Sequence, residues 1–189
     1  MDEIIDEQRI ESLIQALEQI LADLSAAVRV RDGAAQAAAL SRMTGVRREL
    51  EAIRVSQDTA FAALLDIEPG VNEHEKVDRL LQAFIYGARL KHIRSDVMGE
   101  EETSAKVARQ TYAIAVRLDA VGPGRRAALL PLLDHAHSNV RAMAAVCLMK
   151  SMPERACPVL DEISQSARGT SAGSTAYWSL STHRFDAAL

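Results

Sequence analysis

Apolar residues spaced three or four positions apart run through almost the whole chain, and no other feature limits its fold as strongly. A side chain returns to the same face of an α-helix about every 3.6 residues, so this spacing indicates amphipathic helices. Alanine and leucine are abundant and aromatic residues are few, which favours helix over sheet. We therefore predict an all-α protein. The longest stripe contains Ile10, Leu13, Ile14, Leu17, Ile20, Leu21, Leu24 and Val28.

The first two stripes predict an N-terminal helical hairpin over residues 1–68. The first helix is expected to end at Asp32-Gly33, and a short break of this kind favours an antiparallel pair. The first helix also nearly fits a heptad, so a coiled-coil homodimer through the N-terminal helices stays open as an alternative. The stripe of the second helix contains Leu40, Met43, Val46, Leu50 and Ile53, and Phe61, Leu64 and Leu65 mark its continuation or a short third helix.

A break at residues 68–76, EPGVNEHEK, separates this hairpin from a second domain expected over residues 75–189. Proline and glycine stop the preceding helix. Beyond two further helices, the chain is expected to form one helix pair around the turn DHAHSN and a looser second pair that ends near Leu180. Helix pairs that bury one face against the next pair are typical of an α-solenoid.

Charge is distributed unevenly along the sequence. Residues 1–68 carry thirteen acids and seven bases, whereas residues 69–189 carry thirteen acids and fifteen bases. Binding to nucleic acid needs a concentrated basic face, so nucleic acid is not expected as the main partner. No apolar run reaches the roughly 18 residues of a membrane span, and the N-terminal segment MDEIIDEQRI is acidic where a secretory signal is basic. We expect a cytoplasmic protein with no membrane partner.

His135 and His137 lie in the turn DHAHSN and raise the question of a metal site. A site would need a further ligand, and the sequence offers only Asp134 nearby and Cys147 on a face expected to be buried. We therefore interpret the segment as a turn, in which Ser138 or Asn139 caps the following helix. Cys147 and Cys157 are too few for a disulfide framework and are expected to stay reduced.

The rest of the sequence contains few residues in patterns typical of a catalytic site. The chain has neither a phosphate-binding loop nor a nucleophile elbow, so we expect no catalytic site, no cofactor, no metal and no enzyme activity. His92 lies among Arg89, Lys91 and Arg94, which we interpret as a solvated helix face. Tyr177 and Trp178 are expected to complete the core of the last helix. The alternative is an aromatic anchor of the type enriched in protein interfaces.

The segment LLPLLDHAHSNVRAMAAVCL resembles a HEAT-type repeat, in which a leucine-rich first helix and a turn precede a second helix that opens with Val-Arg. The resemblance implies that Val140, Arg141, Ala144 and Ala145 pack helix against helix. Residues 77–182, with the segment PERACPVLDEI, are also similar to a bacterial HEAT-like family known as domain of unknown function 2019. The second repeat lacks Val-Arg, so it is expected to act as a terminal cap.

This resemblance implies a non-enzymatic protein-binding module, and more specifically an immunity protein that binds and neutralises a bacterial toxin. An acidic N-terminal hairpin would suit a basic toxin. One alternative is a nucleic-acid-binding protein of the DNA-glycosylase type, which would need Trp178 and an acid such as Asp134 to converge with Arg125, Arg126, Arg141, Arg155 and Arg168. Another is a homodimeric scaffold. We place partner binding at Asp134, His135, His137, Arg141, Tyr177 and Trp178.

Overall fold

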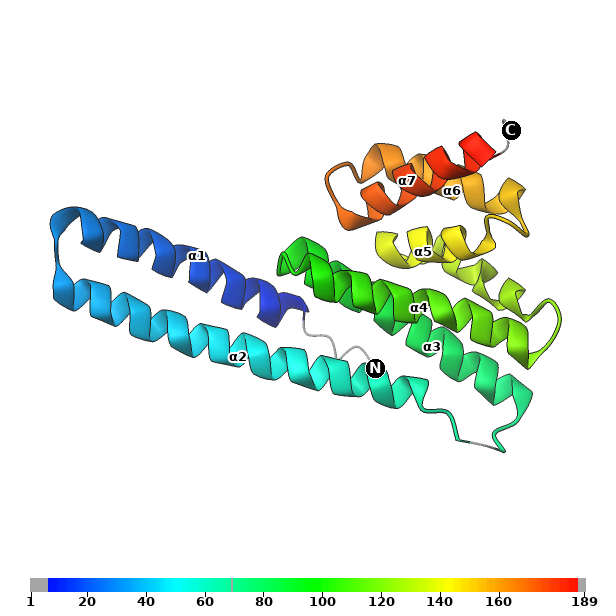
Figure 1. The fold of residues 1–189 in the computed structure, drawn as a ribbon, viewed down its shortest axis with the longest axis horizontal. Helices are drawn as coiled ribbons and strands as arrows, with labels where there is room; N and C mark the ends of the chain where they lie inside the picture. The colour runs from blue at the N-terminus through cyan, green and yellow to red at the C-terminus, as the bar shows by residue number, and fades with distance from the viewer. Residues whose placement is uncertain (1–6, 69, 187–189) are drawn as a thin grey trace. The chain divides into compact units, whose positions relative to one another are not determined.

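The computed structural model describes residues 7–68 and 70–186, and every regular element in these ranges is a helix (Figure 1). The predicted all-α class is therefore confirmed. The chain divides into two compact units, Met1–Ala60 and Phe61–Leu189. Among the described residues, no helix combines the length and the apolar character that crossing a membrane requires.

The first unit is a hairpin of α1 (Glu7–Val30) and most of α2 (Gly33–Leu65), which run antiparallel side by side (Figure 1). Buried side chains on α1 lie three or seven residues apart, spacings that fit the heptad of a coiled-coil seam. Ion pairs also join the two helices, between Arg9 and Glu49 and between Arg42 and Asp23. The side chain of Ile14 lies outside the described residues. The buried seam contains Ile10, Leu13, Ile20 and Ala27 on α1 and Ala39 and Leu50 on α2.

The turn of the hairpin differs from the prediction. The first helix ends at Val30, and Arg31 takes the left-handed conformation with φ 59°. The backbone N–H of Asp32 then donates to the Ala27 carbonyl at 3.0 Å, a bond typical of a helix C-terminus. Gly33 is the first residue of α2 and does not form the break. The second helix continues unbroken through Phe61 to Leu65, which resolves the alternative left open by the sequence.

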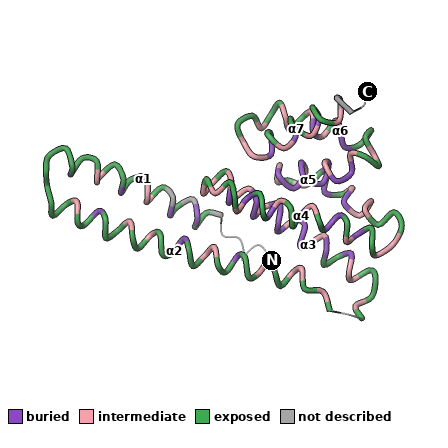
Figure 2. Tube along the Cα trace, viewed as in Figure 1, coloured by how far each residue is buried: buried purple, intermediate pink, exposed green. Residues whose placement is uncertain are grey.

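The second unit contains all the remaining helices. α3 packs against α4, α5 packs against η3 and α6, and α6 packs against α7. Figure 2 shows how densely buried residues occur along α3, α5 and the neighbouring helices. The elements are α3 (Glu73–His92), the π-helical turn η2 (Ile93–Val97), α4 (Glu101–Val121), η3 (Arg125–Asp134), α5 (Ser138–Leu148), α6 (Pro153–Ser166) and α7 (Ser171–Asp186).

The leucine-rich helix of the first predicted pair, η3, is a 3₁₀ helix and contains Pro131. A 3₁₀ helix repeats every three residues, so Leu129 and Leu132 fall on one face. Both are buried, together with Leu133. The leucines therefore have the core role that the sequence suggests, on a tighter helix than the expected one.

Candidate functional site

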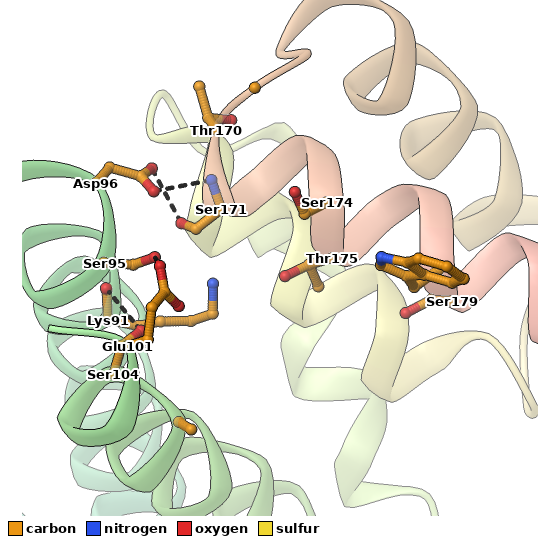
Figure 3. A pocket seen from close by; sticks show the side chains of 13 residues that line it. Lys91, Ser95, Asp96, Glu101, Ser104, Thr170, Ser171, Ser174, Thr175 and Ser179 are labelled. Carbon is orange, nitrogen blue, oxygen red and sulfur yellow. Dashed lines mark hydrogen bonds between the residues drawn. The ribbon is translucent and has the colours of Figure 1, made fainter. Parts of the chain in front are cut away.

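A polar groove of about 680 Å³ lies between the end of α3, the turn η2, the start of α4 and the first half of α7 (Figure 3). Its charged residues are Lys91, Asp96 and Glu101. We call it the serine-rich groove, because hydroxyl groups dominate the rest of its lining. From α7 it receives Ser171, Ser174, Thr175, Ser179 and Trp178.

The sequence of α7 explains why hydroxyl groups face this groove. Positions four apart lie on one side of a helix, so Ser171, Thr175 and Ser179 form a row. Ala172 and Ala176 form a second row one residue further along, and both are fully buried. The helix therefore packs on the core through small apolar side chains and turns its hydroxyl groups toward the groove.

Asp96 joins η2 to the start of α7. Its carboxylate accepts hydrogen bonds from the backbone N–H of Ser171 at 2.8 Å and from the Ser171 hydroxyl at 3.0 Å. It also lies 2.9 Å from the Nδ1 atom of His92 on α3. Burial raises the pKa of Asp96, but the hydrogen bonds from His92 and Ser171 outweigh burial, and the net pKa lies below its usual range. The carboxylate is therefore ionised at neutral pH, which suits the positive end of the helix dipole.

Lys91 and Asn139 form the buried floor beside this carboxylate. Lys91 is 8% exposed and Asn139 is 1% exposed. The Lys91 ammonium donates to Asn139 Oδ1 at 3.3 Å, and the Ser171 hydroxyl lies 3.0 Å from the same oxygen. Burial lowers the pKa of Lys91, and the nearby carboxylates of Asp96 and Glu101 oppose this without cancelling it. The cluster thus links α3, η2, α5 and α7 through polar contacts.

The prediction of a solvated basic face around His92 is wrong for two of its residues. Lys91 is almost fully buried and Arg94 is fully buried. Arg94 forms an ion pair with Glu100, at 3.6 Å between Nη1 and Oε2. Sequence alone shows no sign of this burial, because the partner of Lys91 lies 48 positions away.

His135 and His137 organise the turn before α5. The Nδ1 atom of His137 accepts from the Asn139 N–H at 3.3 Å, so His137 caps the helix in place of the predicted Ser138 or Asn139. The Nδ1 atom of His135 accepts from the His137 N–H at 3.0 Å, and burial lowers the pKa of His135. The His137 ring packs edge-on against His92 with centroids 4.9 Å apart. Within the described ranges, no group of three His, Cys, Asp or Glu residues is arranged to hold a metal ion.

Arg141 has an intramolecular role in this structure. Its Nε donates to the Leu133 carbonyl at 3.2 Å, and its guanidinium forms an ion pair with Glu162. It therefore ties α5 to η3 and α6. Asp134 is exposed at the end of η3. Neither residue lines the serine-rich groove.

Tyr177 and Trp178 lie on the surface, and the prediction that they complete the core is wrong. Tyr177 is 58% exposed and Trp178 is 68% exposed, because Ala172, Ala176 and Leu180 already occupy the buried face of α7. The two rings contact each other edge to face, with centroids 5.3 Å apart. Trp178 lines the serine-rich groove and also a second groove of about 470 Å³, which Tyr177 shares.

Three of the five arginines required by the nucleic-acid hypothesis form ion pairs within the protein. Arg125 pairs with Glu73, Arg126 pairs with Asp119, and Arg141 pairs with Glu162. These acids lie on three different helices. Arg168 lines the second groove with Trp178 and Asp161, so an acid other than Asp134 accompanies the tryptophan.

The thiol of Cys147 is buried and is not activated as a nucleophile. It is 8% exposed, and burial raises its pKa to about 12. A thiol of this kind is a poor nucleophile at neutral pH, because the thiolate is the reactive form.

The resemblance to HEAT-like repeats depends only on the residues quoted above. No protein-family model matches the chain, and no curated protein or solved structure matches it either.

Proposed function

We propose that this protein is a non-enzymatic protein-binding module, in which the pairs α3–α4, η3–α5 and α6–α7 form a short α-solenoid. The sequential packing of these helices supports the proposal. Solenoids present extended surfaces, and their function lies in binding through those surfaces. The observation that carries the proposal is the exposed ring pair of Tyr177 and Trp178.

Aromatic side chains of this size are energetically unfavourable when they are exposed on a helix that faces water. Leaving a large apolar side chain in water forgoes roughly 1.5–3 kcal/mol of burial free energy. Trp and Tyr are also the residues most enriched among those that dominate binding energy in protein interfaces. The ring pair is bordered by two polar grooves, an arrangement that matches an apolar anchor within a polar rim.

The partner that we propose is a toxin that the protein binds and neutralises. Residues 1–68 carry six more acids than bases, which would attract a basic partner over long range and speed its association. This attraction should weaken as salt is added.

Affinity capture of the tagged protein from its own cells tests the proposal. We expect a stoichiometric protein partner, whose toxicity on expression is relieved by co-expression of this chain. The double variant Tyr177→Ala and Trp178→Ala should lose the partner. The matched control is Val116→Ala on α4, since Val116 is 63% exposed and lies away from both grooves. Capture of nucleic acid alone, or equal capture by the double variant, would contradict the proposal.

A further inference from the structure

Two histidines hold the turn before α5 through nitrogen atoms that can be protonated. The Nδ1 atom of His135 accepts from the His137 N–H at 3.0 Å, and the Nδ1 atom of His137 accepts from the Asn139 N–H at 3.3 Å. A backbone N–H can only donate, so each Nδ1 atom acts through its lone pair, and the proton of each neutral ring lies on Nε2. We call residues 135–139 the histidine turn.

Protonation of either ring removes an acceptor from the histidine turn. Both nitrogens of an imidazolium carry hydrogen, so a charged ring would direct N–H against N–H. Histidine is the side chain whose charge ordinarily changes between pH 5 and 8. The common capping residues Ser, Thr, Asp and Asn keep their acceptor throughout this range. The two hydrogen bonds of this turn therefore depend on pH in a way that an ordinary helix cap does not.

The surroundings of His135 make its neutral form the favoured one in the fold. Burial lowers the pKa of His135, and the nearby positive charge of Arg89 lowers it further. The His137 ring packs edge-on against His92, with centroids 4.9 Å apart. The Nδ1 atom of His92 lies 2.9 Å from Asp96. The two rings of the turn are thus bordered by a cation on one side and by a third histidine on the other.

Every element packed against the start of α5 was considered for charge, and the first turn of α7, Ser171–Ser174, carries none. The charged and titratable groups that contact the turn, or the residues bonded to it, are Arg89, Lys91 and His92 on α3, Asp96 on η2, Glu101 on α4, Asp134 on η3, Arg141 on α5 and Glu162 on α6.

The direction of the pH effect follows from His135. Its pKa in the fold lies below the ordinary value of 6.5, so the unfolded chain binds this proton more readily. Stability is therefore fully present above about pH 6.5 and is lost as the pH falls from that value through the lowered pKa. Acid loosens the turn, and it does so above the range below about pH 4 in which Asp96 is protonated.

The histidine turn also positions a residue of the buried floor of the serine-rich groove. Asn139, whose N–H is held by His137, is 1% exposed. Its side-chain oxygen accepts from Lys91 at 3.3 Å and lies 3.0 Å from the Ser171 hydroxyl. Loss of the cap on Asn139 therefore acts on the polar cluster that links α3, α5 and α7.

We propose that the histidine turn is a pH-sensitive switch, in which protonation of His135 and His137 uncaps α5 and loosens Asn139 at the floor of the serine-rich groove. The inference concerns the state of the second unit and does not depend on the identity of a partner. Asparagine at the same two positions would accept at every pH between 5 and 8, so the choice of histidine is what makes the turn sensitive to acid.

Paired substitutions separate the acceptors from their titration. Asparagine accepts from the N–H two residues further on in an Asx turn and is a preferred N-cap, so His135→Asn with His137→Asn keeps both acceptors and removes both titrations. His135→Ala with His137→Ala removes the acceptors at every pH. His74→Asn is the matched control, since the His74 side chain is 88% exposed and lies at the start of α3, the opposite end from His92.

Amide hydrogen exchange of the full chain, followed by NMR at about pH 8 and about pH 5, measures the protection of the Asn139 N–H relative to its intrinsic rate. We expect the protection factor of the unmodified chain to fall at least about fivefold at the lower pH, the size of one lost cap. The His74→Asn variant should behave in the same way. The asparagine double variant should keep its protection at both pH values, and the alanine double variant should be weakly protected at both.

Equal protection of Asn139 in the unmodified chain at the two pH values would overturn the inference. So would an acid-induced loss that persists in the asparagine double variant, because it would then arise from a group that every variant keeps, such as His92. If the double variant does not fold, the single variants His135→Asn and His137→Asn supply the test. Each should reduce the acid-induced loss of protection, and an undiminished loss in both would equally contradict the switch.

Discussion

Asp96 shows how one carboxylate can position a whole helix. Its two oxygens receive the N–H and the hydroxyl of Ser171, at the first residue of α7, while His92 approaches from α3. A carboxylate at this position satisfies one of the N–H groups that a helix leaves without partners in its first turn. The orientation of the hydroxyl row in the serine-rich groove therefore depends on a residue 75 positions earlier in the chain.

Replacement of Asp96 by asparagine should destabilise the second unit. The variant keeps the shape of the side chain but loses the charge that strengthens its hydrogen bonds, so we expect the free energy of unfolding to fall by about 1–3 kcal/mol. Urea unfolding followed by circular dichroism measures this change. Asp134→Asn is the control, since Asp134 is exposed and has no hydrogen bond or ion pair among the described residues. Equal stability of the two variants would show that Asp96 does not hold α7.

The lowered pKa of Asp96 also fixes the direction of a pH effect. A carboxyl whose pKa is lower in the folded state stabilises the fold above its ordinary pKa of about 3.9. This contribution is lost as the pH falls through the lowered value. The unmodified chain should therefore lose more stability than Asp96→Asn as the pH falls below about 4. Parallel acid dependence in both proteins would contradict this assignment.

At the scale of elements, α3 and α4 approach closely at Gly87. A Cβ atom at this position would lie 2.2 Å from the Thr111 Oγ1 atom and 2.8 Å from the Phe61 ring. Phe61 is 3% exposed and stacks on Tyr86 with centroids 5.9 Å apart, so the ring has little room to move. The absence of a side chain at Gly87 is what allows the helices to pack at this distance.

Gly87→Ala should consequently lower stability by about 1–3 kcal/mol, because overpacking outweighs the gain in helix propensity. Gly45→Ala in α2 is the matched change, since a Cβ there meets no atom within 4 Å. That variant should gain up to about 1 kcal/mol. Thermal and urea unfolding of both variants measure the expected loss and the expected gain of stability. A stabilised Gly87→Ala variant would contradict the close approach.

The helices could be predicted from the sequence because their signal is local. Apolar periodicity places the helices correctly, and Cys147 is buried where the stripe predicts it, whereas Leu21, Val28 and Leu40 of the predicted hairpin stripes are exposed. Which face of α7 is buried is not a local property. A large aromatic residue such as Trp178 suggests a core position, but Ala172 and Ala176 permit closer packing and take that face. The groove was missed for the same reason, since Lys91 meets Asn139 only after the chain has folded back.

At the scale of the whole molecule, the two units differ in charge as well as in packing. Residues 1–60 carry eleven acids and seven bases, while residues 61–189 carry fifteen of each. The division between the units falls inside α2, at Ala60 and Phe61. The predicted boundary at residues 68–76 begins after the end of that helix at Leu65 and overlaps the first turn of α3, which starts at Glu73. The position at which α2 ends and the position at which the chain divides into compact units therefore differ.

All residues of the serine-rich groove lie between positions 91 and 179, within the second unit. The stack of Phe61 on Tyr86 is also internal to that unit. A chain of residues 61–189 should therefore fold alone, unfold cooperatively and show the same Trp178 emission as the full chain.

The association rate with the captured partner should behave differently. If the acidic hairpin steers a basic partner, residues 61–189 should bind it more slowly at low salt, with the difference shrinking as salt is added. Surface plasmon resonance at two salt concentrations measures this. If the truncated chain stays folded and binds the partner as fast as the full chain, the hairpin has no role in recognition. Failure of residues 61–189 to fold would instead show that the hairpin completes the second unit.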